Sequence, residues 1–240
     1  LVFAFFYEAR SLPFSHFALM RPVAVEPGTA EPVNSQVELS ERSASLAVLR
    51  IRSFSGTASE MDSVCNVIHQ RGYDKLIVDL RDNPGGTVAA GLSFAMHVAD
   101  TTMDGGLFLT RRWWSTHTKV PDALQKMAIP KFSEANYDLI ISGIHREVGL
   151  RLEVIPEAPH YAGKLFILTN SRTASTCEPL VYCLEHTGRA TVIGEPTAGA
   201  MLNGEFFPVG DGFESIVPTA DYYTADGVRL DHRGVKPNIK

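Results

Sequence analysis

The sequence predicts an α/β fold in which a mostly parallel sheet is flanked by helices. Strand-like and helix-like patterns alternate from residue 45 to residue 98, and the same alternation returns from residue 164 to residue 194. Helices that cross over between successive strands are typical of parallel sheets. With 240 residues, 45% of them apolar, the chain is long enough to bury one sizeable core.

The first alternation contains two strands, each followed by a helix. Apolar, β-branched runs predict the strands, and apolar residues on one face, such as Met61, Cys65 and Ile68, predict the first helix. Gly72 is a plausible end for that helix, and a turn with two adjacent glycines precedes the second one. We expect strands at 46–51 and 75–80, a helix up to residue 72, and a helix at 88–98.

The second alternation predicts a strand at 164–169, a helix from about residue 175 to residue 186, and a strand at 190–194. Shorter strand-like pieces follow at 205–209 and 214–218. The stretch 105–163 is less regular, although it contains a helical pattern near 137–148, and we interpret it as an insertion or cap beside the core.

Composition narrows the range of partners. The formal net charge is −5 and the sequence pI is about 5.9, so neither nucleic acid nor an anionic membrane is an expected partner. No apolar run reaches the roughly 18 residues of a membrane span. The three cysteines show neither metal-ligand spacing nor a disulfide framework. A protein or peptide partner stays open.

The turn before the helix near residue 175 is polar and built of small residues (TNSRTASTCE, 169–178). A side chain at a helix start lies over unpaired backbone N–H groups and the positive end of the helix dipole, which suit the stabilisation of an oxyanion. Ser175 is therefore a candidate nucleophile. Taken alone, Ser175 or Thr173 is equally interpretable as a helix cap.

A second motif, DLRDNPGG (79–86), ends a predicted strand with paired glycines, which let the backbone turn sharply and approach a ligand. A purely structural turn is the alternative interpretation. Two more motifs follow in the chain, GEPTAGA (194–200) and DHRGVKPN (231–238). Together with the nucleophile turn, motifs in this order are far more specific than any one of them.

The blocks "KLIVDLRDNPGG", "ILTNSRTASTCEPLVYCLEHTGRATVIGEPTAGA" and "YYTADGVRLDHRGVKPNI" resemble the C-terminal processing (tail-specific) and tricorn-core serine peptidases. The resemblance implies a ClpP/crotonase-like core and a nucleophilic serine three residues before a glutamate, which selects Ser175. It also implies an oxyanion hole that maps onto Gly85 or Gly86 together with Thr176.

The resemblance also bears on the general base. Ala200 occupies the position of the lysine base in one branch of the family, which argues against a Ser-Lys dyad. The tricorn-like branch uses a histidine from the N-terminal part and an acid before the final motif. These map onto His16, which follows Ser15, and onto Asp231; His232 is the fallback base.

We therefore predict a serine endopeptidase with a Ser-His-Asp arrangement, acting on a protein or peptide by acyl transfer to water. Residues 1–45 form an N-terminal segment that contributes the histidine, and residues 46–240 form the catalytic domain with its insertion at about 105–163. No metal or organic cofactor is required. Arg111 and Trp113 are candidate substrate-binding residues, although a surface strand with a buried Trp explains them equally well. A periplasmic or secreted location is the family-level expectation.

Other functions remain open. Repeats of the interphotoreceptor retinoid-binding protein resemble the same blocks, so a non-catalytic lipid-, retinoid- or peptide-binding module is the main alternative. A crotonase-type enzyme acting on acyl thioesters would need a coenzyme A site, for which we find no sequence feature. Cys177 lies on the apolar side of the first helical turn and is more typical of a packing residue than of a nucleophile.

Overall fold

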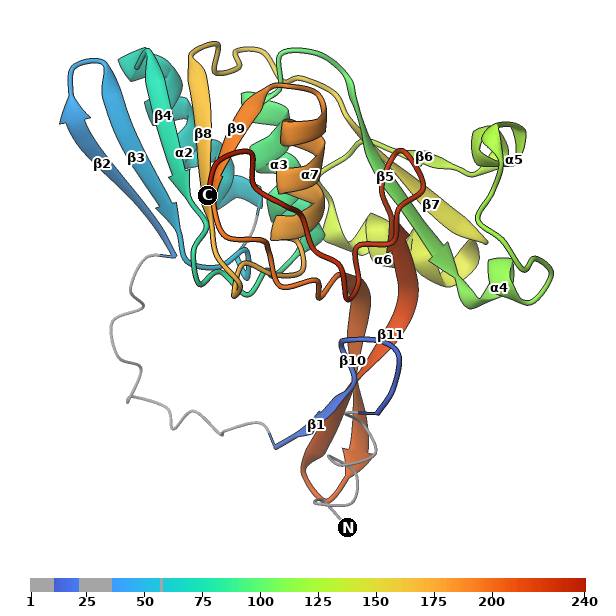
Figure 1. Ribbon diagram of the computed structural model, residues 1–240. Coiled ribbons are helices and arrows are strands. Elements are labelled where there is room, and N and C mark those ends of the chain that lie inside the picture. The colour runs from blue at the N-terminus through green and yellow to red at the C-terminus, as the bar shows by residue number, and fades with distance from the viewer. Residues whose placement is uncertain (1–10, 22–35, 57) are drawn as a thin grey trace.

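The computed structural model describes residues 11–21, 36–56 and 58–240. It contains two sheets with helices packed between and beside them (Figure 1). The mixed α/β class predicted from the sequence is confirmed. The arrangement differs from the prediction in one respect, because only one of the two sheets is mostly parallel.

The first sheet has five strands in the order β2-β3-β4-β8-β9, with β2 antiparallel and the other neighbours parallel. Its register places Leu49 beside Val78, Val78 beside Ile167 and Ile167 beside Val192. All four side chains are fully buried, which explains why the strands read as apolar runs. The strands are β2 (Val37–Ser43), β3 (Leu46–Ile51), β4 (Lys75–Asp79), β8 (Lys164–Thr169) and β9 (Ala190–Gly194).

Three helices cover this sheet and fill the space toward the second one: α2 (Ala58–Arg71), α3 (Val88–Val98) and α7 (Cys177–His186). Helix α7 contacts β9 of the first sheet and β5 of the second, and α3 packs against both α2 and α7 (Figure 1). At Gly91 of α3 an added Cβ would lie 2.5 Å from the Thr176 side chain. The glycine therefore allows α3 to approach the start of α7 closely.

The second sheet has the order β1-β11-β5-β7-β6, and β10 also pairs with β11. Its pairings are antiparallel except for β6 with β7, so the expected parallel arrangement does not extend to it. The stretch interpreted as an irregular insertion supplies much of this sheet. Its elements are β5 (Met103–Thr110), α4 (Arg111–Trp114), α5 (Ala123–Ala128), β6 (Lys131–Phe132), α6 (Tyr137–Arg146) and β7 (Gly149–Val154).

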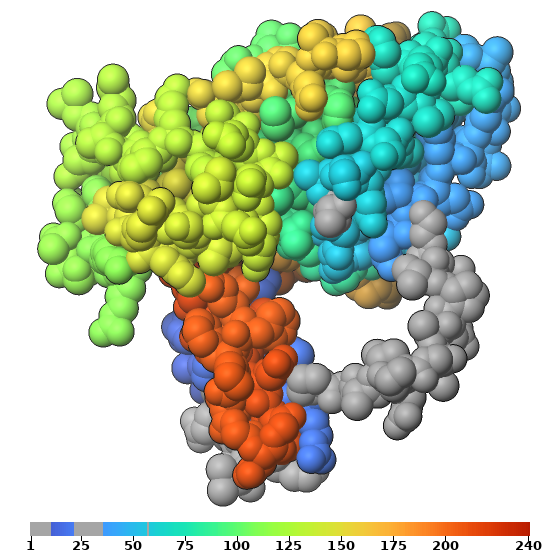
Figure 2. Space-filling view, turned by 180° about the vertical axis from the view of Figure 1, so that it is seen from behind, coloured from blue at the N-terminus to red at the C-terminus, as the bar shows by residue number. Residues whose placement is uncertain are grey.

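A long hairpin of β10 (Leu202–Gly210) and β11 (Phe213–Tyr223) projects from the body of the molecule (Figures 1 and 2). The short strand β1 (Ala18–Met20) pairs antiparallel with β11, with Ala18 beside Ile216. This pairing connects the N-terminal part of the chain to the second sheet, more than 150 residues away in sequence. Within the described part of the chain, no helix is both long and apolar enough to cross a membrane.

Candidate active site

The predicted motifs meet where the parallel strands β4 and β8 end. The turn after β4, the turn after β8 and the loop after β9 all follow carboxyl ends of neighbouring strands, which lie at one edge of the sheet. Ligand sites of open α/β sheets occupy this edge. The parallel pairing therefore places the turns that carry Gly85, Gly86 and Ser175 side by side.

Ser175 has a φ of 55°, a left-handed conformation that is uncommon for a residue other than glycine. Its N–H group donates to the Ala200 carbonyl at 3.1 Å and to Glu178 Oε2 at 3.1 Å. These contacts hold the strained turn, and such strain is often found at functional positions. Ala200 stands at the position where one branch of the resembled family has its lysine base, and its backbone carbonyl helps to position Ser175.

The fully buried side chain of Glu178 is the centre of this turn. Besides the Ser175 N–H, it accepts from Thr197 Oγ1 and the Gly199 N–H at 2.7 Å each, and from the Ala200 N–H at 2.8 Å. Burial raises the pKa of Glu178, and these hydrogen bonds oppose the rise. With four donors and no acceptor facing it, the side chain suits a carboxylate that ties α7 to the loop after β9.

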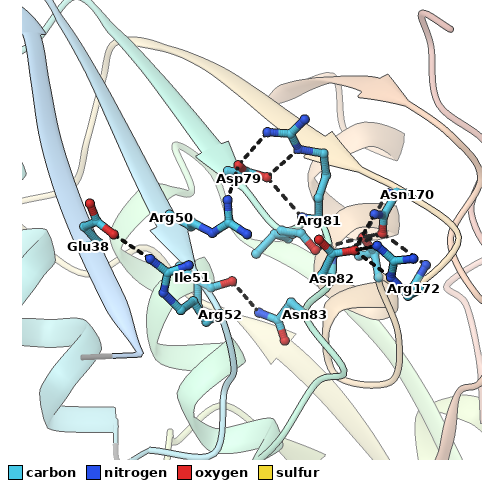
Figure 3. Close-up of polar contacts among 12 residues, drawn as sticks. Glu38, Arg50, Ile51, Arg52, Asp79, Arg81, Asp82, Asn83, Asn170 and Arg172 are labelled. Carbon is cyan, nitrogen blue, oxygen red and sulfur yellow. Dashed lines mark hydrogen bonds and ion pairs between the residues drawn. The ribbon is translucent and has the colours of Figure 1, made fainter. Parts of the chain in front are cut away.

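Asn83 holds the glycine turn against the sheet. This fully buried amide donates to the Ile51 carbonyl at 2.9 Å (Figure 3) and accepts from the Gly85 N–H at 2.8 Å. At Gly85 an added Cβ would lie 2.6 Å from Ser175 Cβ, so only glycine permits this approach. The glycine turn and the nucleophile turn therefore form one unit.

The charged residues of the DLRD segment support this unit from outside. Asp82 accepts from Asn170 Nδ2 and from Arg172 Nε, both at 2.7 Å, and so joins the turn after β4 to the turn after β8 (Figure 3). Asp79 binds Arg81 at 2.9 and 2.8 Å, and these hydrogen bonds and positive charges lower the pKa of Asp79 against the opposing effect of its burial. Both carboxylates have partners within the protein and are not aimed at the serine.

His16 reaches the serine from the N-terminal segment. Its Nε2 lies 3.3 Å from Ser175 Oγ, and its Nδ1 lies 2.8 Å from Ser15 Oγ. Burial lowers the pKa of His16 below its ordinary value, while the negative charge of Asp231 opposes this change. The unprotonated imidazole is the form that accepts a proton from the hydroxyl, and a lowered pKa favours that form.

Asp231 lies close to this histidine but contacts it indirectly. Its fully buried carboxylate accepts from the Ser15 N–H at 3.2 Å and pairs with Arg229 at 3.2 Å. Within the described residues no hydrogen bond joins Asp231 to the imidazole, and Ser15 stands between the two. The Asp231 carboxylate is thus linked to His16 by way of Ser15, and its negative charge opposes the lowering of the imidazole pKa by burial.

The backbone donors predicted for an oxyanion hole differ in their availability. The Gly85 N–H is occupied by Asn83, whereas the N–H groups of Gly86 and Thr176 donate to no partner among the described residues. Both residues line the same cleft as Ser175 and His16. Of the two glycines that the sequence left open, Gly86 is the one with a free donor.

The cleft has a volume of about 640 Å³. Its walls come from the loops after β3, β4 and β8, from the starts of α3 and α6, and from β5, β10 and β11 of the second sheet. They include side chains that the sequence did not single out. Phe108, Tyr137 and Met201 form apolar parts of the wall, and Glu205 adds a carboxylate that is held by His145 at 2.7 Å. No local motif marks these residues, because they converge only when the second sheet packs beside the first.

The predicted substrate-binding residues lie elsewhere. Trp113 is buried in α4, where its indole donates to the Lys119 carbonyl at 2.9 Å, and Arg111 lines a separate cavity of about 330 Å³ beside Trp114. Neither lines the Ser175 cleft, so the structure does not bring these two residues to the other predicted site residues. The cause is local: the residues form a short helix, and the indole faces a small apolar cluster with Leu107.

The structure also shows where the last two candidates, His232 and Cys177, lie. His232, the fallback base, is exposed and lies 3.6 Å from Asp231 without lining the cleft. Cys177 is fully buried, and burial raises the pKa of its thiol, in agreement with a packing role.

The family model of Peptidase family S41 matches residues 45–240. The chain belongs to this family. The curated relatives include a carboxyl-terminal-processing protease of Picosynechococcus sp., 28% identical over 191 residues, which are 79% of this chain and 37% of the relative. The chloroplastic carboxyl-terminal-processing peptidase 3 of Arabidopsis thaliana is 25% identical over 201 residues, covering 83% of this chain and 32% of the relative. This S41 chain thus spans about a third of the length of these relatives.

Solved structures show the same fold. The photosystem II D1 C-terminal processing protease superimposes with a TM-score of 0.57 at 21% identity, covering 95% of the S41 chain and 48% of that protein. Mature CPAF complexed with lactacystin gives a TM-score of 0.58 at 17% identity, covering 81% and 47%. The family predicted from the sequence blocks is confirmed.

Proposed function

We propose that this S41 chain is a serine endopeptidase in which Ser175 is the nucleophile and His16 the general base. The observation that carries the proposal is the 3.3 Å approach of His16 Nε2 to Ser175 Oγ, between residues 159 positions apart in the chain. Catalytic hydrogen bonds of free enzymes are often this long and shorten when substrate binds. The family supplies the reaction class, peptide-bond hydrolysis.

In the proposed reaction, Ser175 Oγ attacks the carbonyl carbon of the scissile bond while His16 Nε2 takes its proton. The amine leaves with that proton, and water then hydrolyses the acyl-enzyme by the reverse transfer. The Ser15 hydroxyl holds Nδ1 of the imidazole, and Asp231 holds Ser15 by its backbone. The Asp231 carboxylate stabilises the imidazolium that forms.

The N–H groups of Gly86 and Thr176 are the proposed oxyanion donors. Two observations support this assignment. Neither N–H group has a hydrogen-bond partner among the described residues, and both residues line the cleft beside Ser175. Loss of one such donor typically lowers the rate by ~10²–10³. Asn83 would contribute to the oxyanion hole indirectly. Its side-chain oxygen accepts from the Gly85 N–H and so positions the backbone that carries the Gly86 N–H.

The proposed substrate is a protein or peptide whose apolar side chains contact the Phe108 and Tyr137 walls of the cleft. A ClpP/crotonase-type core belongs to the same proposal, supported by the placement of the site at the carboxyl ends of parallel strands. The periplasmic or secreted location remains an expectation based on the family resemblance.

Labelling with a fluorophosphonate probe tests the proposal. We expect the parent and Ser171→Ala to be labelled, because Ser171 is an exposed serine of the same turn. Ser175→Ala and His16→Ala should stay unlabelled while their circular dichroism matches the parent.

A folded parent that is not labelled would reject the active peptidase for this chain. The main alternative, a lipid- or retinoid-binding module of the same fold, would then be tested by titration with a fluorescent retinoid.

A further inference from the structure

A cluster of metal-ligating side chains lies outside the proposed catalytic site. Asp62 of α2, His97 of α3 and Glu157, in the connection from β7 to β8, bring one ligand atom each to within 4.8 Å of one another. Helix α3 begins at the cleft, where Thr87 and Val88 line it, and His97 is near its other end. At 1.5 Å per residue the cluster is about 14 Å farther along the helix.

The two contacts of the His97 imidazole differ in length. Its Nε2 lies 3.2 Å from Asp62 Oδ1, within hydrogen-bond distance, and 3.8 Å from Glu157 Oε2, which is too far for a hydrogen bond. Two ligand atoms about 2.1 Å from a tetrahedral zinc ion are about 3.4 Å apart, a value between these two distances. An ion could therefore contact all three side chains where a single proton cannot.

The charges of the cluster also favour a bound cation. Two carboxylates approach a single imidazole nitrogen, and among the described residues no lysine or arginine forms an ion pair with either carboxylate. One N–H donor cannot bond well to both acids, and two like charges at one site disfavour each other. A divalent cation bound by the unprotonated nitrogen would neutralise both carboxylates.

Other contacts within the protein hold the three segments of the cluster in place. The His97 side chain is 7% exposed, and Ser93, one turn earlier on α3, donates to Asp62 at 2.6 Å. The Glu157 N–H donates to the Met96 carbonyl at 2.9 Å, which fixes the connection against the end of α3. The carboxylate side chains are 46% and 51% exposed, so solvent can reach the cluster and supply a further ligand.

We propose that Asp62, His97 and Glu157 bind a divalent first-row transition-metal ion, for which zinc is the natural probe. One imidazole with two carboxylates is a donor set suited to zinc. Nearby Cys65 is not assigned as a ligand, because its sulfur is not among the ligand atoms that lie within 4.8 Å of one another. The ion joins α2, α3 and the β7–β8 connection, which makes it a structural site independent of Ser175.

Zinc titration of the full chain by calorimetry, after treatment with a chelator, tests the site. The main variant is Glu157→Gln, since an exposed side chain is replaced without leaving a buried gap; His97→Gln is the second. Glu60→Gln on α2 and His160→Gln near Glu157 are matched controls. We expect one zinc per chain and at least a tenfold loss of affinity in both site variants, with the controls unchanged.

Two further measurements distinguish a specific metal site from nonspecific metal binding. Cobalt(II) should give the visible absorption of a four-coordinate ion in the parent and lose it in Glu157→Gln. Zinc should raise the melting temperature of the parent, because a ligand that binds only the folded state stabilises it. The proposal is overturned if the parent binds no zinc or if Glu157→Gln binds it as tightly as the parent.

Discussion

The two halves of the proposed catalytic pair are built differently. Ser175 belongs to a turn that the core holds in many ways: its N–H has two acceptors, and Glu178 beneath it has four donors. His16 lies just before the three-residue strand β1, and its ring has hydrogen bonds only to Ser15 and Ser175 among the described residues. The nucleophile is part of the scaffold, whereas the base is brought to it by a short edge strand.

This difference predicts different consequences of mutation. Changes beneath Ser175 should lower both the free energy of unfolding and the activity, because the same hydrogen bonds serve the core and the site. Changes around His16 should lower activity while leaving stability nearly untouched. Four predictions follow this comparison from the largest expected effect to the smallest.

Glu178→Gln should have the largest effect. The amide places an NH₂ donor among groups that are themselves donors and leaves buried partners unsatisfied, so we expect a loss of about 3 kcal/mol in unfolding free energy. At about 2–4 °C per kcal/mol, the melting temperature should fall by about 10 °C, and hydrolysis should be abolished. Thermal unfolding checks this, with Glu185→Gln on the same helix as control. A stable, active variant would show that the scaffold does not depend on this carboxylate.

Asp231→Asn should lower kcat/KM by about 10²-fold, since the imidazolium loses its nearby negative charge. Burial lowers the pKa of His16 and Asp231 raises it, so removing the charge lowers this pKa further. The base works in its neutral form, and the acid limb of the pH profile should therefore move to lower pH. A profile of kcat/KM across pH 4–8 checks the direction, and a limb displaced to higher pH would contradict the assignment of His16.

Ser15→Ala should lower kcat by about tenfold, because the ring loses the contact that orients Nδ1 while Nε2 keeps its position near the serine. The melting temperature should change little, since Ser15 lies outside the core. Steady-state kinetics and thermal unfolding are measured together, with Ser63→Ala as control. A large fall in the melting temperature would contradict this prediction. It would mean that the segment around His16 contributes to the stability of the core as much as the turn around Ser175 does.

Arg111→Ala should have the smallest effect, with kcat/KM within about twofold of the parent. Arg111 lines a cavity separate from the cleft, and exposed substitutions away from a site rarely alter it. Peptide hydrolysis measured at several substrate concentrations checks this. A KM that rises strongly would restore the substrate-binding role predicted from the sequence.

Local chemistry was sufficient to predict much of the scaffold. The helix predicted at 88–98 is α3, and the strands predicted at 164–169 and 190–194 are β8 and β9. These strands are central or neighbouring parallel strands of the first sheet, buried on one face and half-buried on the other, and they therefore read as largely apolar runs. The glycine turn was recognisable for a similar local reason, because its backbone conformation requires glycine. The serine turn was identified by the resemblance of its sequence block.

The second sheet and the base side were decided by contacts between distant segments. Strand β5 is interrupted by a register shift between Asp104 and Leu107, and the short strand β1 gains its place only by pairing with β11. Family resemblance suggested His16, but no local pattern shows that Ser15 stands between it and Asp231. The choice of Gly86 over Gly85 likewise depends on where the Asn83 side chain lies.

The sequence by itself determined the α/β class and the glycine turn, since these depend on periodicity and on local backbone limits, and the resemblance of its blocks selected Ser175. Only the tertiary structure decided how His16 reaches Ser175, which backbone donors remain free and which walls enclose the cleft. Those features depend on hydrogen bonds and packing between residues far apart in the chain, and such contacts leave no local pattern.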